Sequence, residues 1–373
     1  MISRRTLLTL PIAAACSSGR RAGFHGYAFT ANEEGHAVAA VDLEALAVAR
    51  HIPLDAAPVQ VLALRSRPLV FALTAETGSV HEIHVDRLRY SRKIAVAQTA
   101  VTMRIADNER ALYVLGKQPR SLVRIALDSW TEDWRVTLPD EPVDFELSPG
   151  GKFAGVSSAG SVRLVDLASG HASDPLAGAD SKMGGDFGAV MFRKDGRLLI
   201  AADRGERRLS LYDVAEGRLV THLPLAVRPD NLCVNQDGGQ LFVTGEGMDA
   251  VVIVYPFHSE VGETVLAGHA PGPMAASTSF LFLASPQFGD VSILNIGNRK
   301  VIGSVTVGSD PGCIAITPDD QFALVLNRKS GDVAVIRVGG ITGTERARRF
   351  KMASLLTVIP VGSRPVSAAF RGV

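Results

Sequence analysis

The chain of 373 residues is long enough for one large domain or two average ones. Its 39 Lys and Arg residues nearly balance its 38 Asp and Glu residues, so the net charge of +1 gives no reason to expect nucleic acid as a partner. Aromatic residues make up only 6% of the chain, whereas 36 Gly and 19 Pro suit short strands joined by frequent turns, which indicates an all-β protein.

The amino terminus has the layout of an export signal. Arg4 and Arg5 precede an apolar run of about ten residues, which is half the length needed to span a bilayer. The segment Ser3–Leu8 resembles a twin-arginine signal, and the basic start of an ordinary secretory signal is similar. Either signal predicts export, so we expect the mature protein in the periplasm or at the cell surface.

Cys16 directly follows a run of three alanines and precedes a short segment rich in Ser and Gly. This pattern resembles a bacterial lipobox, in which the cysteine is lipidated and becomes the first mature residue, although Ala13 stands where Leu, Val or Ile is more frequent. The other interpretation is cleavage at an Ala-x-Ala site just before an incidental cysteine. We expect lipidation of Cys16, because a free exposed thiol is a liability outside the cytoplasm.

A short alternating strand that ends near an Asp or its equivalent recurs along the rest of the chain. The copies are Ala37–Asp42, His81–Asp86, Val123–Asp128, Ser161–Asp166, Leu209–Asp213, Val251–Tyr255, Val291–Asn295 and Val333–Arg337. Their ends are spaced by about 42 residues on average, which lies within the range of propeller repeats. Eight copies predict eight repeating units.

Each unit repeats the same internal parts. A strand such as Gln240–Thr244 precedes a tight polar turn such as Gly289-Asp290, whose residues tolerate positive φ. The alternating strand follows, then an outer run such as Lys300–Gly308, and finally an inner strand and a second hairpin turn. The sequence therefore predicts an all-β propeller of eight four-stranded blades.

Three segments of the later repeats, Leu241–Gly245, Asp290–Leu294 and Asp310–Asp319, resemble the YVTN repeat of bacterial β-propeller proteins. The resemblance covers about residues 26–373 and is strongest in the last two repeats. Members of this family are often seven-bladed. The alternative is therefore a seven-bladed ring in which the irregular stretch Lys152–Asp195 is an insertion.

The two ends of the repeat region fit a closed ring. The chain enters at the second strand of a unit, Tyr27–Thr30, and finishes with an unmatched inner strand, Pro365–Phe370. Pairing these two strands removes the edge that an open sheet would expose. We therefore predict a signal peptide over residues 1–16, a tether over 17–25 and one propeller domain over 26–373, with membrane contact only through the lipid.

In a propeller, the segments just before the inner strands gather at one mouth of the central channel. Five of the eight equivalent positions there are charged: Glu141, Asp186, Arg228, Asp310 and Arg364. Strand alternation predicts that side chains a little further along face the bore: Gln60, Thr102, Asp144, Asn231 and Ser367. We take as candidate ligand-binding residues Glu141, Asp144, Asp186, Arg228, Asn231, Asp310 and Arg364. The alternative is a solvated ring of loop charges around channel water.

Motifs for specific chemistry are not found in the sequence. It has no Gly-x-Ser-x-Gly elbow, phosphate-binding glycine loop, zinc motif or CxxCH signature, and its two Trp are too few for the Trp-rich blades of quinoproteins. Asp144 and Glu146 offer only a weak divalent-cation site, and Cys233 and Cys313 lie in repeats that are not neighbours. We expect no metal, no cofactor and no disulfide.

The leading functional hypothesis is a non-catalytic, monomeric binding or scaffold propeller of the cell envelope, which recognises a protein, peptide or glycan through one face. The alternative is a hydrolase resembling the propeller lactonases, in which mouth carboxylates and arginines polarise a lactone and activate water. Convergence of Glu141, Asp144, Asp186 and Arg228 on one point would favour the hydrolase. A wide, hydrated bore would favour the scaffold.

Overall fold

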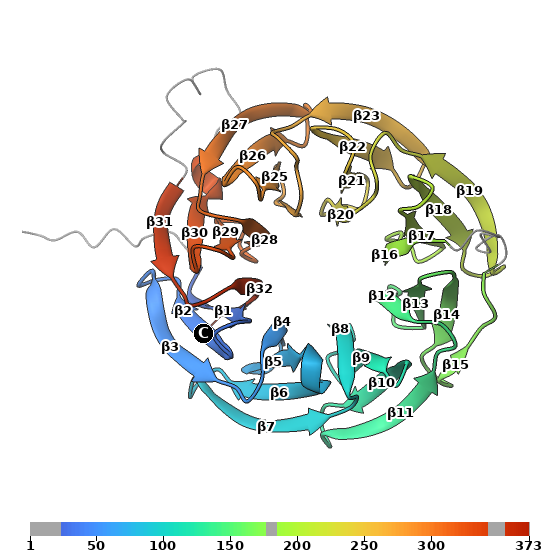
Figure 1. Ribbon diagram of the computed structural model, residues 1–373, viewed down its shortest axis with the longest axis horizontal. Helices are drawn as coiled ribbons and strands as arrows, with labels where there is room; N and C mark the ends of the chain where they lie inside the picture. Colours follow the sequence, from blue (N-terminus) through green and yellow to red (C-terminus); the bar gives the residue numbers. More distant parts are fainter. Residues whose placement is uncertain (1–23, 177–184, 342–354, 373) are drawn as a thin grey trace, which may run out of the picture.

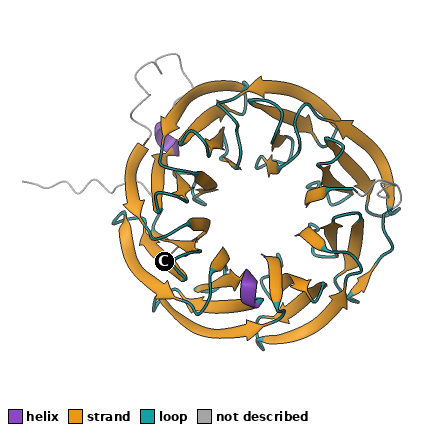
Figure 2. Cartoon of the chain, in the orientation of Figure 1, coloured by secondary structure: helices purple, strands orange, loops and turns teal. Residues whose placement is uncertain are grey.

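The computed structural model describes residues 24–176, 185–341 and 355–372. The predicted signal peptide, Cys16 and nearly all of the tether lie outside these described residues. The described strands form eight four-stranded antiparallel sheets, arranged as blades around a central channel (Figure 1; Figure 2). Two single-turn 3-10 helices, η1 (Ala75–Thr77) and η2 (Val338–Gly340), interrupt them. In the described part of the chain, no helix is long and apolar enough to cross a membrane.

Each blade has an inner strand at the channel, two middle strands and an outer strand at the periphery. From inside to outside, the blades are: blade 1, β32 (Pro365–Gly372), β1 (Gly26–Asn32), β2 (Ala37–Asp42) and β3 (Ala47–Pro53); blade 2, β4 (Pro58–Ala63), β5 (Leu69–Thr74), β6 (Ser79–His84) and β7 (Arg89–Ala95); blade 3, β8 (Thr99–Ile105), β9 (Ala111–Gln118), β10 (Ser121–Ala126) and β11 (Thr131–Thr137); blade 4, β12 (Pro142–Leu147), β13 (Phe153–Ser158), β14 (Val162–Asp166) and β15 (His171–Ala172). The other four are: blade 5, β16 (Phe187–Phe192), β17 (Leu198–Asp203), β18 (Arg208–Asp213) and β19 (Arg218–Pro224); blade 6, β20 (Asn231–Val234), β21 (Leu241–Thr244), β22 (Ala250–Tyr255) and β23 (Glu260–Leu266); blade 7, β24 (Met274–Ala276), β25 (Phe280–Ser285), β26 (Asp290–Asn295) and β27 (Lys300–Thr306); blade 8, β28 (Pro311–Ile316), β29 (Phe322–Asn327), β30 (Asp332–Arg337) and β31 (Leu355–Pro360).

The prediction of eight blades is confirmed, and the seven-bladed alternative is not realised. The irregular stretch Lys152–Asp195 is no insertion, because it supplies β13, β14 and β15 of blade 4 and β16 of blade 5. Its irregularity lies in the outer strand β15, which has only two residues. Beyond β15, the main chain of Ser173 and Leu176 continues to pair with β14 through bonds of 2.8 Å each.

The predicted ring closure is also confirmed. The last strand, β32, pairs antiparallel with β1, from Gly26 opposite Gly372 to Asn32 opposite Pro365. Blade 1 therefore combines the two ends of the described chain, and Figure 1 shows β32 lying at the channel beside β1. Closure by this exchange gives blade 1 four strands, like the other blades, and covers the edge of β1.

The Asp that ends the third strand in several repeats has a local structural role. In Asp42, Asp166 and Asp213, one carboxylate oxygen accepts two main-chain N–H bonds of 2.8–3.0 Å from the residues two and three positions later. These bonds satisfy main-chain donors in the turn that leads to the outer strand. The repeated Asp is thus explained by turn formation and needs no functional role.

The hydrophobic core lies between neighbouring blades. The middle strands are almost wholly buried, whereas most residues of the outer strands are exposed. Eight apolar clusters each join residues of two successive blades; in one of them, Phe71 and Leu73 of blade 2 pack with Met103 of blade 3. Because each blade takes part in two clusters, the stability of the ring depends on every blade being complete.

Candidate functional site

The mouth of the channel is formed by two sets of loops on the same face. One set precedes the inner strands, and the other joins the two middle strands of each blade. In blades 5, 6 and 8, a charged residue of the first set pairs with an opposite charge of the second, 18 positions later. Nη2 of Arg328 lies 2.7 Å from Oδ1 of Asp310, and Arg204 pairs with Asp186 in the same way.

The other three predicted mouth charges also have partners. Nη1 of Arg228 lies 3.3 Å from Oε2 of Glu246, and its Nε lies 2.8 Å from Oδ1 of Asp230. Glu141 pairs with Lys117 of blade 3 at 2.8 Å. Arg364 pairs through Nε with Glu33 at 2.7 Å and through Nη1 with Glu34 at 3.5 Å.

The five predicted mouth charges are therefore compensated separately around the ring. In the residues that the structure describes, no ion pair or side-chain hydrogen bond joins two of Glu141, Asp186, Arg228, Asp310 and Arg364. No direct contact thus joins any two of Glu141, Asp186 and Arg228, three of the residues whose convergence would favour a hydrolase. Exposed ion pairs contribute only about 0–1 kcal/mol each, so a ligand can replace them at little cost to stability.

Deeper in the channel, three predicted bore residues are brought together on successive inner strands. The side chain of Gln60 donates to the carbonyl of Met103 at 3.1 Å and accepts from the main-chain N–H of Met103 at 2.8 Å. Its Oε1 also accepts from the hydroxyl of Thr102 at 3.0 Å. Arg104 then donates to Thr102 Oγ1 at 2.7 Å, to Asp144 Oδ1 at 3.2 Å and to Glu146 Oε2 at 3.1 Å.

We call these side chains, Gln60, Thr102, Arg104, Asp144 and Glu146, the bore network. Arg104 is its central member, and the sequence reasoning missed it. The signal was present, because Arg104 stands two residues after Thr102 and strand alternation puts both on the same face. Burial raises the pKa of Asp144, and the Arg104 guanidinium opposes this effect.

The two carboxylates of the bore network already have a cationic partner. Arg104 pairs with both Asp144 and Glu146, the two carboxylates considered for a divalent cation. Over residues 24–176, 185–341 and 355–372, no group of three or more His, Cys, Asp or Glu side chains is placed to hold a metal ion.

Several bore-facing side chains join one blade to the next. The main-chain N–H of Val61 donates to Ser367 Oγ at 3.2 Å, and that of Val190 donates to Asp144 Oδ2 at 3.4 Å. In the same way, the main-chain N–H of Met103 in blade 3 donates to the side chain of Gln60 in blade 2. These polar residues therefore stabilise the ring as well as lining its channel.

The bore is more polar on one side than on the other. At the positions that carry Ser367, Gln60, Thr102 and Asp144 in blades 1–4, blades 5, 7 and 8 carry Ala189, Ala275 and Cys313. Asn231 of blade 6 is half-buried, and no side-chain hydrogen bond links it to another described residue. The polar side of the channel thus spans blades 1–4.

The two described cysteines are free thiols on inner strands of the less polar side. Burial raises the pKa of Cys233 to about 12 and that of Cys313 to about 11. Both thiols therefore stay protonated at neutral pH and are poor nucleophiles.

Asp310 and Arg364 are the two candidate residues that share a cavity. This cavity, which we call the rim cavity, lies at the mouth between blades 8 and 1 and has a volume of about 420 Å³. It is lined by Glu34, Asp310, Arg328, Lys329 and Arg364. Its lining is therefore wholly charged.

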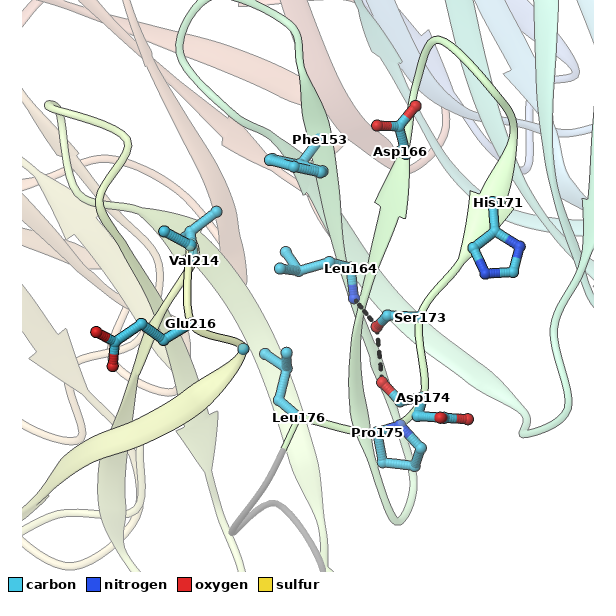
Figure 3. Close-up of a pocket in the computed structure, with 12 residues that line it drawn as sticks. Phe153, Leu164, Asp166, His171, Ser173, Asp174, Pro175, Leu176, Val214 and Glu216 are labelled. Atoms are coloured by element: carbon cyan, nitrogen blue, oxygen red, sulfur yellow. Dashed lines mark hydrogen bonds between the residues drawn. The ribbon is translucent and has the colours of Figure 1, made fainter.

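A second cavity of about 390 Å³ lies at the periphery, between the outer parts of blades 4 and 5 (Figure 3). Phe153, Leu164, Leu176 and Val214 form its apolar part, and the Ser173 hydroxyl links Leu164 N–H to the carbonyl of Asp174. The cavity exists because blade 4 has so short an outer strand. Leu176 directly precedes residues 177–184, which lie outside the described structure, so we assign no function to this cavity.

A third cavity, of about 110 Å³, lies against His81 at the seam between blades 1 and 2. The His81 side chain is buried; its Nε2 lies 3.4 Å from Asp55 Oδ1 and 3.2 Å from Thr74 Oγ1. Asp55 also pairs with Lys93, and the Tyr90 ring centre lies 5.7 Å from the imidazole. Burial lowers the pKa of His81, although the Asp55 carboxylate opposes this effect.

This lowered pKa predicts a loss of stability in acid. Because the unfolded chain takes up the His81 proton near pH 6.5 and the folded protein only at lower pH, the free energy of unfolding should fall as the pH drops below about 6.5. The slope from one such group is at most about 1.4 kcal/mol per pH unit. Urea unfolding measured between pH 8 and pH 5.5 should give a free energy of unfolding that falls less steeply with pH in His81→Gln than in the wild type. Part of the fall that remains in the variant is due to His222, whose pKa burial also lowers. An identical slope in the variant and the wild type would refute this assignment.

Comparison with known proteins supports the architecture. No family model matches the chain. The seven-bladed beta-propeller protein Rv1057 of Mycobacterium tuberculosis is 22% identical over 145 residues, which is 37% of each chain, so the match spans little more than a third of that relative.

Solved structures match over more of the chain. Dihydro-heme d1 dehydrogenase NirN in complex with DHE is 12% identical with a TM-score of 0.73, covering 92% of this chain and 75% of that one. Kuenenia stuttgartiensis hydrazine synthase is 19% identical with a TM-score of 0.58, covering 75% and 95%. A functionally unknown protein from Desulfotomaculum acetoxidans is 11% identical with a TM-score of 0.61, covering 93% and 99%. These likenesses concern the fold alone, and with the eight sheets of the structure they identify the chain as a β-propeller.

Proposed function

We propose that the protein is a non-catalytic binding propeller of the cell envelope, which recognises a protein, peptide or glycan partner through the mouth face of the ring. The observation that carries this proposal is the separate compensation of the five mouth charges on different blades. Catalysis needs its acid, base and stabilising groups within hydrogen-bond reach of one point. A partner that covers several blades can instead read a pattern of charges spread around the rim.

Two exposed apolar side chains on the same face support this proposal. Met248 and Phe288 lie in mouth loops of blades 6 and 7 and are 42% and 59% exposed. The Phe288 ring centre lies 5.1 Å from that of His269, which belongs to the loop between these blades. Aromatic and Met side chains are enriched in the central parts of protein interfaces. These mouth-face side chains thus have the composition of a docking surface.

The envelope location rests on the export signal over residues 1–16 and on lipidation of Cys16. A lipid on Cys16 would hold the propeller at a membrane through the tether. The partner is then expected among envelope proteins, peptides or glycans rather than among nucleic acids, since the net charge of the chain is only +1.

Site-specific photo-crosslinking tests this proposal in cells that produce the protein. A photoreactive residue in place of Phe288 should form adducts with a partner, because Phe288 is exposed on the mouth face. The matched control carries the same residue in place of Ser279, which is exposed in the hairpin turn of the same blade on the opposite face. Adducts confined to position 288 support the proposal. Equal adduct formation at both positions, or none at either, would refute recognition through the mouth.

A lactonase-like hydrolase is the second candidate, favoured by one observation. Asp144 is a carboxyl in the channel whose pKa is raised by burial, as in a general acid or base. The wild type should then hydrolyse sugar lactones, and Asp144→Asn should not. Proton release from the acid product measures the hydrolysis. Hydrolysis that persists in this variant, or that the wild type does not catalyse, would remove this candidate.

A further inference from the structure

The rim cavity gives the mouth face a more specific chemistry. We infer that it binds an oxyanion, the carboxylate or phosphate group of a small ligand or of a partner. The inference deepens the proposed function, since it names the chemical group recognised at one place on the same face. Its volume of about 420 Å³ lies in the range of small-molecule sites.

One cation of the lining has no acidic partner. The cavity is lined by three cationic side chains, Arg328, Lys329 and Arg364, and by two carboxylates, Glu34 and Asp310, and a third carboxylate, Glu33, pairs with Arg364 from outside the lining. The cation that pairs with no carboxylate among the residues that the structure describes is Lys329, which is exposed. An ammonium group at the edge of a cavity attracts an anion and has three hydrogen-bond donors to offer it.

The two arginines are held in place by ion pairs that leave donors unused. Arg328 donates from Nη2 to Asp310, whose side chain is only 19% exposed. Arg364 uses Nε for Glu33 and Nη1 for Glu34. A guanidinium has five N–H donors, so both groups keep donors beyond these contacts. A fixed guanidinium with free donors suits the planar oxygens of a carboxylate or the oxygens of a phosphate.

Gly312 on the inner strand β28 explains how Arg328 reaches this position. A Cβ atom at residue 312 would lie 2.3 Å from Nε and 2.5 Å from Cδ of Arg328. The missing side chain therefore lets the arginine lie against the inner strand, next to Asp310. The backbone of Gly312 does not have a positive φ, so alanine can adopt its conformation and would displace only the arginine.

Blade 5 contains the same arrangement without the additional cation. There a Cβ atom at residue 188, which is Gly, would lie 3.2 Å from Nε of Arg204, and Arg204 pairs with Asp186. The residue after Arg204 is Gly205, where blade 8 has Lys329. The Asp–Arg pair is thus a repeated structural feature of the mouth, and Lys329 is the specific addition in the rim cavity.

Calorimetric titration of the purified protein at low ionic strength tests the inference. The probes are citrate and inorganic phosphate, with sodium chloride at matched ionic strength as the blank. Saturable one-to-one binding of at least one probe is expected, weakened about tenfold in Lys329→Gln, the loss expected when one charge-assisted hydrogen bond is removed. Gly312→Ala should weaken binding by a similar factor through the displaced Arg328. Stronger binding of citrate would indicate a carboxylate ligand, and stronger binding of phosphate a phosphorylated one.

Lys194→Gln is the matched control. It removes the same charge from an exposed lysine on the opposite face, whose ammonium group donates to the carbonyl of Gln236, so it should bind the probes as the wild type does. The inference is overturned if neither probe binds saturably, or if Lys194→Gln weakens binding as much as Lys329→Gln. Its failure is distinguishable from that of the proposed function. Crosslinking at position 288 without probe binding would refute only the oxyanion site, and probe binding without crosslinking would refute only the docking of a partner.

Discussion

A chain that lacks its last nine residues, Pro365–Val373, should form no folded ring. These residues contain β32, which is the inner strand of blade 1 and pairs with β1 along its whole length. The same strand takes part in two apolar clusters: Val366 and Ala369 pack toward blade 2, and Ala368 and Phe370 pack toward blade 8. The deletion therefore opens two inter-blade cores and exposes the edge of β1. Net stabilities of proteins are only about 5–15 kcal/mol, so the expected loss exceeds what the ring can tolerate.

The measurement is a thermal melt of the purified truncated chain, followed by circular dichroism, with the yield of soluble protein as a second readout. The synthetic peptide Pro365–Val373, added in trans, should restore a cooperative melt, because it binds only the folded arrangement. Ser367→Ala is the matched point variant. It removes one bond, from Val61 N–H, and should lower stability by about 1 kcal/mol without preventing closure. A truncated chain that melts like the wild type would show that closure by β32 is dispensable.

The blade count and the ring closure could be predicted because they depend on local patterns. Turn residues such as Gly289-Asp290 and third-strand ends such as Asp213 act within one hairpin, and each hairpin is contiguous in the sequence. Ring closure follows by counting, since Pro365–Gly372 has no other inner position to fill.

The candidate site was less predictable because its contacts join residues that are far apart in the sequence. Strand alternation places both Arg104 and Asp144 in the bore, but it does not show that they pair, because Arg104 lies on the inner strand of the preceding blade. The charge of Asp310 is visible in the sequence, whereas its compensation by Arg328 requires the fold of the blade. The eight repeats can be aligned on two loops, the one before the inner strand and the one between the middle strands. Such an alignment would have shown opposite charges 18 residues apart. The sequence therefore contains the information on these ion pairs, but only when both loops of each repeat are compared.

Arg104→Met should be the most damaging single substitution in the bore. It removes the cation that contacts both Asp144 and Glu146, whose side chains are 20% and 36% exposed. Removing one partner of a buried ion pair costs about 3–5 kcal/mol, because the other charge is left uncompensated. We expect a value of about 3 kcal/mol, at the lower end of this range, because both carboxylates are only partly buried. Urea unfolding at pH 7 measures this loss.

The double variant Arg104→Met, Asp144→Asn separates the loss of the ion pair from general damage to the bore. An uncharged Asn at residue 144 needs no cation and can still accept from Val190 N–H, so the double variant should recover about half of the loss or more. The pH dependence of the single variant has a definite sign. Burial raises the pKa of Asp144, and removing Arg104 takes away the largest opposing cause and leaves only the main-chain N–H bonds of Phe145 and Val190, so the folded state binds the proton more tightly than the unfolded state. Arg104→Met should therefore regain stability relative to the wild type as the pH falls from 7 to 5. A loss below about 0.5 kcal/mol with no coupling between residues 104 and 144 would mean that channel water screens the bore network, and that the apolar clusters between blades hold the ring without it.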